Sequence, residues 1–421
     1  MLKMRAFSRC FKLSFKSYSL IPAAFVLMVF FVAIAASGQD LSQQVRVVNV
    51  CVPVRVFAGD QFVDNLTMRD FAVFEDGEPQ VIESVYLVKG ARLERKETPT
   101  AFEPETSRSF YLFFSMYEYD AQIPRALRYL FEKVIRPGDK LVVVTPRNAY
   151  NMEAQAAGKV PPSKLVDELT KKIRKDIMAG DAAYRSVLAD LRRLAGAGGI
   201  REQMNPAGEL TEEQQMSQIG EGTIEEFVMK YRSDVDRLEQ LRTIDEEKFL
   251  EFARVLKKTE GQKNVFYFYQ KEFVPVPNAS VLSQYSQSLT VQSLIADLAG
   301  MLNRRSSFDV GRLRKAFADS SINVHFLYLT KNPAEIPLSQ IAERGDILST
   351  FEELVAATGG SSVRSANVGY LMERAASASE HYYLLYYSPK DKSQDGRFRQ
   401  VRVEVKTGRF RVFHKAGYIA D

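Results

Sequence analysis

Cysteine is scarce in this chain, with two residues among 421. Cys10 lies in a basic stretch near the start of the sequence, which leaves Cys51 alone in the remainder. A lone cysteine can form neither an internal disulfide nor a thiolate metal site. Cys51 also falls in a segment with the residue alternation of a β-strand, where a packed or half-exposed thiol is more common than a nucleophile.

Histidine is nearly as scarce, with three residues in the chain. His325 lies between apolar strand residues, and His381 and His414 lie at strand ends, which are ordinary structural positions. The sequence contains no nucleophile elbow, phosphate-binding loop, zinc-ligand spacing or dinucleotide fingerprint. We therefore expect a protein that is not an enzyme, with no catalytic residue and no cofactor.

Acidic residues are absent from the first 39 positions, where five lysines and arginines precede an apolar run from Leu20 to Ala36. Small residues close this run up to Gly38, as in a cleaved export signal. The alternative is that residues 1–38 remain as a membrane anchor, because the run reaches the lower length limit of a membrane span. Either alternative predicts an exported protein, periplasmic or secreted, that meets the membrane only through an uncleaved segment.

The rest of the chain has no excess of charge. Of the 57 lysines and arginines, five lie in residues 1–38, which leaves 52 to balance 52 acidic residues. Nucleic-acid binding relies on a basic surface that neutralises phosphates. The balance of charge therefore argues against a nucleic-acid partner.

Residues 107–375 are predicted to form an α/β domain. The buried strand 109–115 leads into a loop at 115–120, a helix follows at 123–134, and a second buried strand covers 141–145. A strand–helix–strand unit of this kind belongs to a parallel sheet. Ligands of such sheets bind at the carboxyl ends of the strands, so we expect the loop at 115–120 to determine what the protein binds.

Later segments continue the α/β pattern around a helical insertion. A helix that Ser163 would cap, strands at 264–269 and 322–328, and helices at 309–319 and 346–357 are predicted. The long separation between the strands at 141–145 and 264–269 exceeds one crossover helix, so we expect a helical insertion over 176–242. Capping boxes begin at Thr223 and Thr243, and a polar helix is predicted near 280–302.

Two β segments flank the α/β domain, over residues 45–90 and 381–418. Valines alternate along 48–56, where Pro53 suggests an edge strand. A strand over 70–75 ends in the Asp76-Gly77 turn, and 81–88 is predicted to return as its partner. Residues 89–107 are predicted to be a linker. Because the two segments lie on either side of the α/β domain, we expect them to pair into one accessory antiparallel module.

Five stretches occur in an order and spacing that resemble one bacterial family, the exported von Willebrand factor A (VWFA)-related proteins. They are Leu66–Gln80, Arg136–Asp139, Leu354–Gly360, Tyr382–Pro389 and Ala416–Tyr418. The resemblance implies a VWFA-like, Rossmann-like fold, a mostly parallel sheet flanked by helices. The insertion at 176–242 lies outside it.

Members of this family usually carry a metal-ion-dependent adhesion site, in which an Asp-x-Ser-x-Ser motif, a threonine and an aspartate offer hard oxygen ligands to Mg²⁺. Here Phe114–Glu118 takes the place of the motif, Pro161–Ser163 that of the threonine, and Tyr269–Glu272 that of the aspartate. A phenylalanine cannot coordinate Mg²⁺, and Lys271 would repel it. We therefore expect that the metal site is lost.

A non-standard Mg²⁺ site remains an alternative, built from Ser115, Glu118, Asp120 and Glu272. The simpler interpretation is a solvated loop in which Asp120 starts the following helix, because a carboxylate is stabilised at a helix N-terminus.

We expect an exported, non-enzymatic binding protein with a protein partner in the cell envelope or outside the cell. Tyrosine suits such contacts because it joins apolar area to a polar tip. The candidate contact residues are Tyr117, Glu118, Tyr119, Gln270 and Glu272. Replacing both loop tyrosines by alanine should then weaken binding without unfolding the protein. The alternatives are a carbohydrate- or envelope-polymer-binding module and a metal-dependent adhesin with altered ligands.

Overall fold

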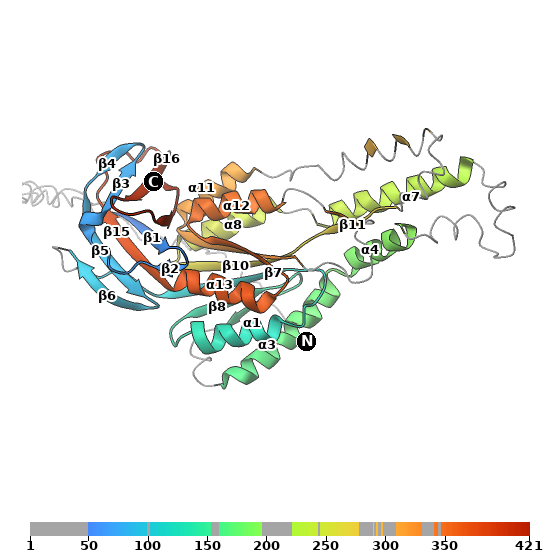
Figure 1. Cartoon of the computed structure of the whole chain (residues 1–421), viewed down its shortest axis with the longest axis horizontal. Coiled ribbons are helices and arrows are strands. Elements are labelled where there is room, and N and C mark those ends of the chain that lie inside the picture. The colour runs from blue at the N-terminus through green and yellow to red at the C-terminus, as the bar shows by residue number, and fades with distance from the viewer. Residues whose placement is uncertain are drawn as a thin grey trace, which may run out of the picture. The chain divides into compact units, whose positions relative to one another are not determined.

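A computed structural model describes residues 49–98, 102–152, 160–195, 221–242, 245–277, 309–330, 341–343 and 347–421, with a few positions between 289 and 297. Residues 1–38 and most of the polar helix expected near 280–302 lie outside this description. Within it, a mostly parallel sheet with helices stands beside antiparallel sheets made from the N- and C-terminal strands (Figure 1). The expected mixed α/β class is therefore confirmed.

The parallel sheet has six strands, of which only the edge strand β9 is antiparallel. Its order is β9 (Ala149–Met152), β8 (Lys140–Val144), β7 (Arg108–Ser115), β10 (Gln262–Gln270), β12 (Ile322–Leu329) and β14 (Ser361–Ser365). Numbered along the chain, the strands read 3-2-1-4-5-6, so the order reverses between β7 and β10. Ligands of open α/β sheets bind at such a switch point, outside the carboxyl ends of the strands.

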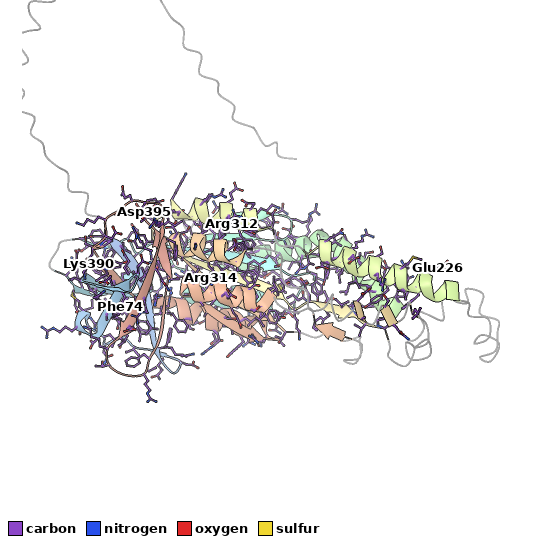
Figure 2. The ribbon with its side chains drawn as sticks, turned by 90° about the horizontal axis from the view of Figure 1, so that it is seen from above. Phe74, Glu226, Arg312, Arg314, Lys390 and Asp395 are labelled. Atoms are coloured by element: carbon purple, nitrogen blue, oxygen red, sulfur yellow. The ribbon has the colours of Figure 1, made fainter. Side chains whose placement is uncertain are left out.

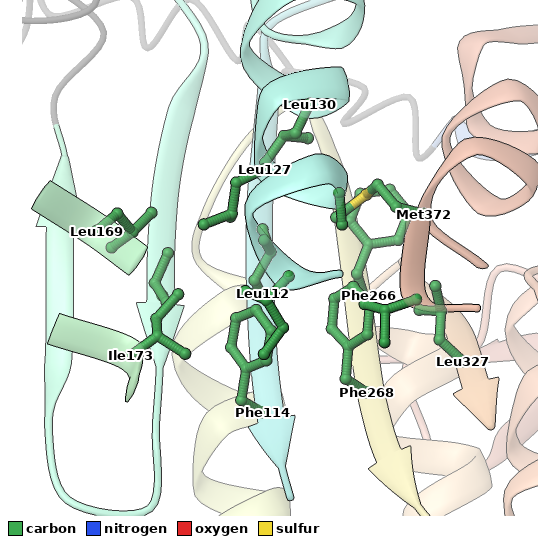
Figure 3. Close-up of a cluster of buried hydrophobic side chains, with 14 of the residues drawn as sticks. Leu112, Phe114, Leu127, Leu130, Leu169, Ile173, Phe266, Phe268, Leu327 and Met372 are labelled. Atoms are coloured by element: carbon green, nitrogen blue, oxygen red, sulfur yellow. The ribbon is translucent and has the colours of Figure 1, made fainter. Parts of the chain in front are cut away.

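Helices cover both faces of this sheet. One face carries α1 (Ile123–Tyr129, continued by a π turn at Leu130–Val134), α3 (Pro162–Gly180) and α13 (Val368–Glu380). The other carries α8 (Glu246–Lys257), α11 (Val310–Asp319) and α12 (Ile347–Thr358). Figure 3 shows the first of these cores, where Leu112, Phe266 and Leu327 of three neighbouring strands meet Leu127 and Met372 of the helices. Each such side chain stabilises the fold by about 1.5–3 kcal/mol when fully buried.

The helix starts differ from those that the sequence predicts. Pro161 is the N-cap of α3 and Pro162 is its first residue, a position that suits the fixed φ angle of proline. Ser163 therefore lies inside the first turn and is not the cap. The N-cap of α8 is Asp245, whose carboxylate accepts a 3.2 Å hydrogen bond from Lys248 N. Helix α7 (Glu221–Gln240) already includes Thr223. Neither predicted capping box therefore starts a helix.

The N- and C-terminal β segments pair, as expected. One sheet has the order β17 (Arg411–His414), β1 (Val50–Ala58), β15 (His381–Tyr387), β5 (Ile82–Lys89) and β6 (Arg92–Glu97), with β2 (Gln61–Phe62) beside β1. The other has the order β18 (Gly417–Ile419), β16 (Phe398–Val405), β3 (Phe71–Glu75) and β4 (Glu78–Gln80). Valines and aromatic rings of both sheets share one core.

Three details of this module differ from expectation. The Asp76-Gly77 turn forms, with positive φ at both residues, but β4 is the returning strand, and β5 joins the other sheet. Residues 89–107, which were expected to be a linker, contain β6, which pairs with β5. Strand β1 is interior rather than an edge. At Pro53 it has a neighbour on one side only, because pairing with β17 starts at Val54.

The glycine pair after α12 lets the β module approach the α/β domain closely. Gly359 has a φ of 70°, and a Cβ there would lie 2.8 Å from the backbone of His414. A Cβ on Gly360 would lie 1.8 Å from Val324 O. Close packing therefore explains why both positions are glycine, since any side chain there would push β17 or β12 away.

The insertion forms a helical pair that extends from the carboxyl edge of the parallel sheet (Figure 1). Helix α4 (Ala182–Ala195) packs on α7, and nearby β11 (Phe273–Pro275) pairs with β13 (Ile341–Glu343). The insertion starts later than residue 176, because α3 continues to Gly180. Among the described residues, no helix is both long and apolar enough to cross a membrane.

Candidate functional site

An arginine occupies the switch point between β7 and β10. Arg242 follows α7, and its side chain is 8% exposed. Its Nε donates a 2.7 Å hydrogen bond to Glu272 Oε1, just beyond the end of β10. Its Nη1 lies 3.8 Å from Asp181 Oδ1, and its Nη2 lies 3.5 Å from Ser115 Oγ at the end of β7. The guanidinium thus connects the insertion to both central strands.

Three tyrosine rings surround this guanidinium. Arg242 Cζ lies 5.9 Å, 5.3 Å and 5.6 Å from the ring centres of Tyr117, Tyr184 and Tyr269. A cation at this distance is attracted by the negative face of an aromatic ring. The Tyr269 hydroxyl also donates a 2.5 Å hydrogen bond to Glu272 Oε1. Arginine, carboxylate and rings form one connected cluster, which we call the Arg242 cluster.

The electrostatics of the Arg242 cluster keep the guanidinium charged. Burial alone would lower the pKa of Arg242, but the charge of Glu272 and the neighbouring tyrosines raise that pKa well above its usual value. Burial, followed by the charge of Glu272, raises the pKa of Tyr269 well above its usual value. Burial likewise raises the pKa of Asp181, against the opposing effect of Arg242. Arg242 therefore remains a cation and Tyr269 remains neutral around pH 7.

Of the four candidate metal ligands, Ser115 and Glu272 both face Arg242, whereas Glu118 and Asp120 have other partners. Ser115 Oγ faces Arg242. Glu118, whose side chain is 42% exposed, lies 3.7 Å from Arg192 of α4. Asp120 is buried and accepts a 2.7 Å hydrogen bond from Gln122 N. The expected helix-start role in a solvated loop is wrong, because Gln122 is the N-cap of α1 and no acidic residue lies in its first turn. In the part of the chain that the structure describes, no three histidine, cysteine or acidic side chains group as metal ligands would.

These residues do not fit a bound Mg²⁺. A divalent cation needs several hard oxygen ligands and repels a neighbouring cation. At the switch point Glu272 is already paired with the guanidinium of Arg242, and Lys271 follows the strand end. The Arg242 cluster thus fills with a protein side chain the place at which a metal would bind.

Three of the five contact candidates are buried and hold the loop together. Tyr117, Gln270 and Glu272 are 2%, 3% and 6% exposed. The Tyr117 hydroxyl donates to Lys271 O at 3.0 Å, and Gln270 Oε1 accepts from Glu118 N at 3.0 Å. A partner cannot reach these three side chains in this structure. The reason is the insertion, because Tyr184 of α4 covers Tyr117, with ring centres 4.9 Å apart.

The expected effect of replacing both loop tyrosines needs a correction for the same reason. Tyr117 belongs to the core of the insertion, so its replacement by alanine would open a cavity in that core. Tyr119 is partly buried, and the guanidinium of Arg174 lies 5.5 Å from its ring centre. Glu118 and Tyr119 therefore remain as the accessible members of the candidate set.

A pocket of about 310 Å³ opens beside the Arg242 cluster. Its apolar wall comes from Phe113, Val144, Phe249 and Phe252, and Lys248 lies at its rim with a side chain that is 80% exposed. The pocket lies at the carboxyl ends of β7 and β8, where sequence reasoning places ligand binding.

Arg242 and Asp181 were not among the residues that the sequence suggested. Both belong to the insertion, which falls outside the family resemblance, and no motif marks them. The only available signal was the Lys271-Glu272 pair after β10. A carboxylate that is buried at that position requires a cation, so Glu272 could have indicated an arginine or lysine partner.

A scan against protein-family models, a search of curated proteins and a search of solved structures each found no match.

Proposed function

We propose that this chain is an exported, non-enzymatic binding protein, whose VWFA-like α/β domain contacts a protein partner without a metal ion. The 3-2-1-4-5-6 strand order, with an antiparallel third strand at the edge, supports the VWFA-like assignment. The export signal rests on the basic, then apolar, composition of residues 1–38.

The observation that carries this proposal is the position of Arg242. It supplies a fixed positive charge at the switch point, already neutralised by Glu272 and close to Asp181. A metal-dependent adhesin needs an open coordination position for a ligand carboxylate. The Arg242 cluster offers none, so recognition falls to the surrounding surface.

That surface combines an apolar recess with charged neighbours. The pocket beside Arg242 is large enough for one apolar side chain of a partner, and Lys248 lies at its rim. Glu118 and Tyr119 lie in the loop that follows β7. Protein interfaces concentrate their binding energy where an anchor residue enters such a pocket, and polar residues form the rim.

Affinity capture tests the proposal. The tagged protein would be crosslinked in its own cell envelope, with and without EDTA, and captured partners identified. We expect a discrete protein partner that is retained in EDTA and lost after protease treatment of the envelope. Loss in EDTA would favour the metal-dependent alternative, and loss only after glycan digestion would favour the carbohydrate alternative.

A pair of charge reversals locates the contact. Lys248→Glu changes the rim of the pocket, while Lys390→Glu makes the same change on an exposed lysine of the β module (Figure 2). We expect Lys248→Glu to reduce capture several-fold and Lys390→Glu to leave it unchanged. Equal capture by all three proteins would exclude this pocket as the contact.

A further inference from the structure

A second and larger pocket lies where the parallel sheet meets the β module. Its volume is about 560 Å³. Its walls come from the amino-terminal half of β14, from α13, and from β1, β2 and β17 of the module. It shares no lining residue with the pocket beside Arg242. Its size falls in the range of small-molecule sites.

Arg55 of β1 is a buried cation in the wall of this pocket. It is 2% exposed, and its Nη1 donates hydrogen bonds of 3.1 Å to Asn323 Oδ1 and to Gly359 O. Its Nε and Nη2 have no hydrogen-bond partner, and no acidic side chain pairs with it, among the described residues. Burial lowers the pKa of Arg55 to about 10, so the guanidinium is still charged at neutral pH. A buried charge without a counter-charge is costly.

Two of the three histidines of the chain line the same pocket. His325 is 1% exposed, and its Nδ1 lies 2.8 Å from Ser361 Oγ. Its Nε2, like Nδ1 of His381, is buried without a hydrogen-bond partner within the described part of the chain. Buried polar atoms are normally paired. Two of these four unpaired nitrogen atoms belong to the guanidinium of Arg55, which can only donate, and they indicate an acceptor that belongs in the pocket. Each of the two imidazole nitrogens can donate to the same acceptor in one of its tautomers.

The lining of the pocket also includes two more arginines, two acidic residues and aromatic surface; of the acidic residues, Glu380 pairs with Arg136 at 3.1 Å. Arg374 of α13 and Arg411 of β17 both pair with Asp60, at 3.1 Å and 3.3 Å. The rings of Phe57 and Phe413 meet edge to face, 5.8 Å apart, along the apolar side. The pocket thus joins a nitrogen-rich, cationic part to an aromatic wall.

We propose that this pocket binds a small organic anion, which carries a carboxylate or a phosphate group on an apolar ring or chain. The anionic oxygens would accept from Arg55 and the histidine N–H groups, and Arg374 would close over them. Guanidinium groups suit this role because their planar N–H donors match two oxygens of a carboxylate or phosphate. The apolar part of the ligand would lie against the aromatic wall.

Calorimetric titration of the purified protein tests this proposal. The probes are phenyl phosphate, benzoate, inorganic phosphate and phenol. We expect saturable one-site binding of phenyl phosphate or benzoate, at least about tenfold weaker binding of inorganic phosphate, and none of phenol. The stronger of the two aromatic anions identifies the preferred anionic group. Absence of saturable binding by both would overturn the proposal.

Two charge-reversed variants assign the binding to this pocket. Arg374→Glu should weaken binding of the aromatic anion at least about tenfold. Arg314→Glu is the matched control (Figure 2), because Arg314 is exposed to a similar extent and pairs with Glu353 at 3.3 Å, away from the pocket. If both variants bind the aromatic anion with equal affinity, the binding site is not this pocket. Arg55→Gln should also lose binding, and a thermal melt of that variant separates lost binding from unfolding.

Discussion

Arg242 Nε lies 2.7 Å from Glu272 Oε1, and both side chains are more than nine-tenths buried. The pair joins the end of the helical insertion to the end of the central strand β10. The insertion is therefore part of the candidate site rather than an appendage to it. Its contribution is a guanidinium that neutralises the carboxylate at the switch point.

Removal of one partner of this pair should destabilise the protein strongly. Arg242→Met leaves Glu272 buried without its cation, and breaking a buried pair in this way costs about 3–5 kcal/mol. The double variant Arg242→Met with Glu272→Met should recover a large part of that loss, because no uncompensated charge remains. Urea denaturation of the wild type, both single variants and the double variant measures the coupling. Additive effects would show that the pair is not coupled.

Divalent cations should have little effect on the folded protein. A ligand that binds only the folded state raises the melting temperature, because it stabilises that state by RT ln(1 + L/Kd), where L is the free ligand concentration. Because Arg242 fills the switch point, we expect millimolar Mg²⁺, Mn²⁺ or EDTA to shift the melting temperature by less than about 1 °C. A rise of several degrees with Mg²⁺ or Mn²⁺, reversed by EDTA, would contradict this and would restore Ser115, Glu118 and Asp120 as candidate ligands.

Stability should fall in mild acid because of His325. Burial, and then the charge of Arg55, lowers the pKa of His325 from 6.5 to about 3. Between these values the unfolded chain binds a proton that the folded protein does not, so the free energy of unfolding decreases as the pH falls below 6.5. From pH 7.5 to pH 4.5 this contribution is about 2–3 kcal/mol. In urea denaturation, the free energy of unfolding of His325→Gln should fall between these two pH values by that much less than the free energy of unfolding of the wild type. Equal losses would exclude His325 as the source.

The Arg136-Pro137-Gly138-Asp139 turn should depend on its aspartate. Asp139 is buried and accepts from Arg108 Nε at 3.0 Å, from Arg108 Nη2 at 2.5 Å and from Arg136 N at 2.7 Å. Asp139→Asn leaves the charge of Arg108 buried and unpaired, which should cost about 3–5 kcal/mol. Asp190→Asn breaks an exposed pair with Arg193 and serves as the control.

Chemical denaturation of the two variants compares them directly. We expect a large shift of the midpoint for Asp139→Asn and little change for Asp190→Asn, because exposed ion pairs contribute little. Similar midpoints would mean that the turn does not require the pair with Arg108.

The order of strands and helices could be predicted where burial patterns are strong. Strands β7, β8, β10 and β12 are apolar runs, and the alternating valines of β1 mark its buried face. The sequence does not reveal β9 or β14, because their side chains alternate between half-buried and exposed without an apolar stripe. The hairpin partner of β3 was also predicted wrongly. The three residues of β4 form the hairpin with β3, and β5, the expected partner, pairs with β15 in the other sheet.

The location of the candidate site could be predicted from the sequence, but the residues that fill it could not. The switch point follows from the chain order of the strands, and so the loop at 115–120 was a reasonable prediction. Whether Tyr117 points to solvent or into a core depends on α4, which is some sixty positions further along the chain and has no motif. Arg242, which completes the site, is still more distant, at 125 positions from Tyr117. Tertiary contacts of this kind leave no local signal.

Strand β1 lies between β15 and β17, and Tyr387 donates a hydrogen bond to Glu75, 312 positions away. Apart from the two residues of β2, the strands that pair with β1 come only after nearly the whole chain has been made. Contacts between such distant residues form slowly, since a long loop must close before they can contribute. Truncation after α13 should therefore leave β1 without β15 and β17, the two strands that lie on either side of it.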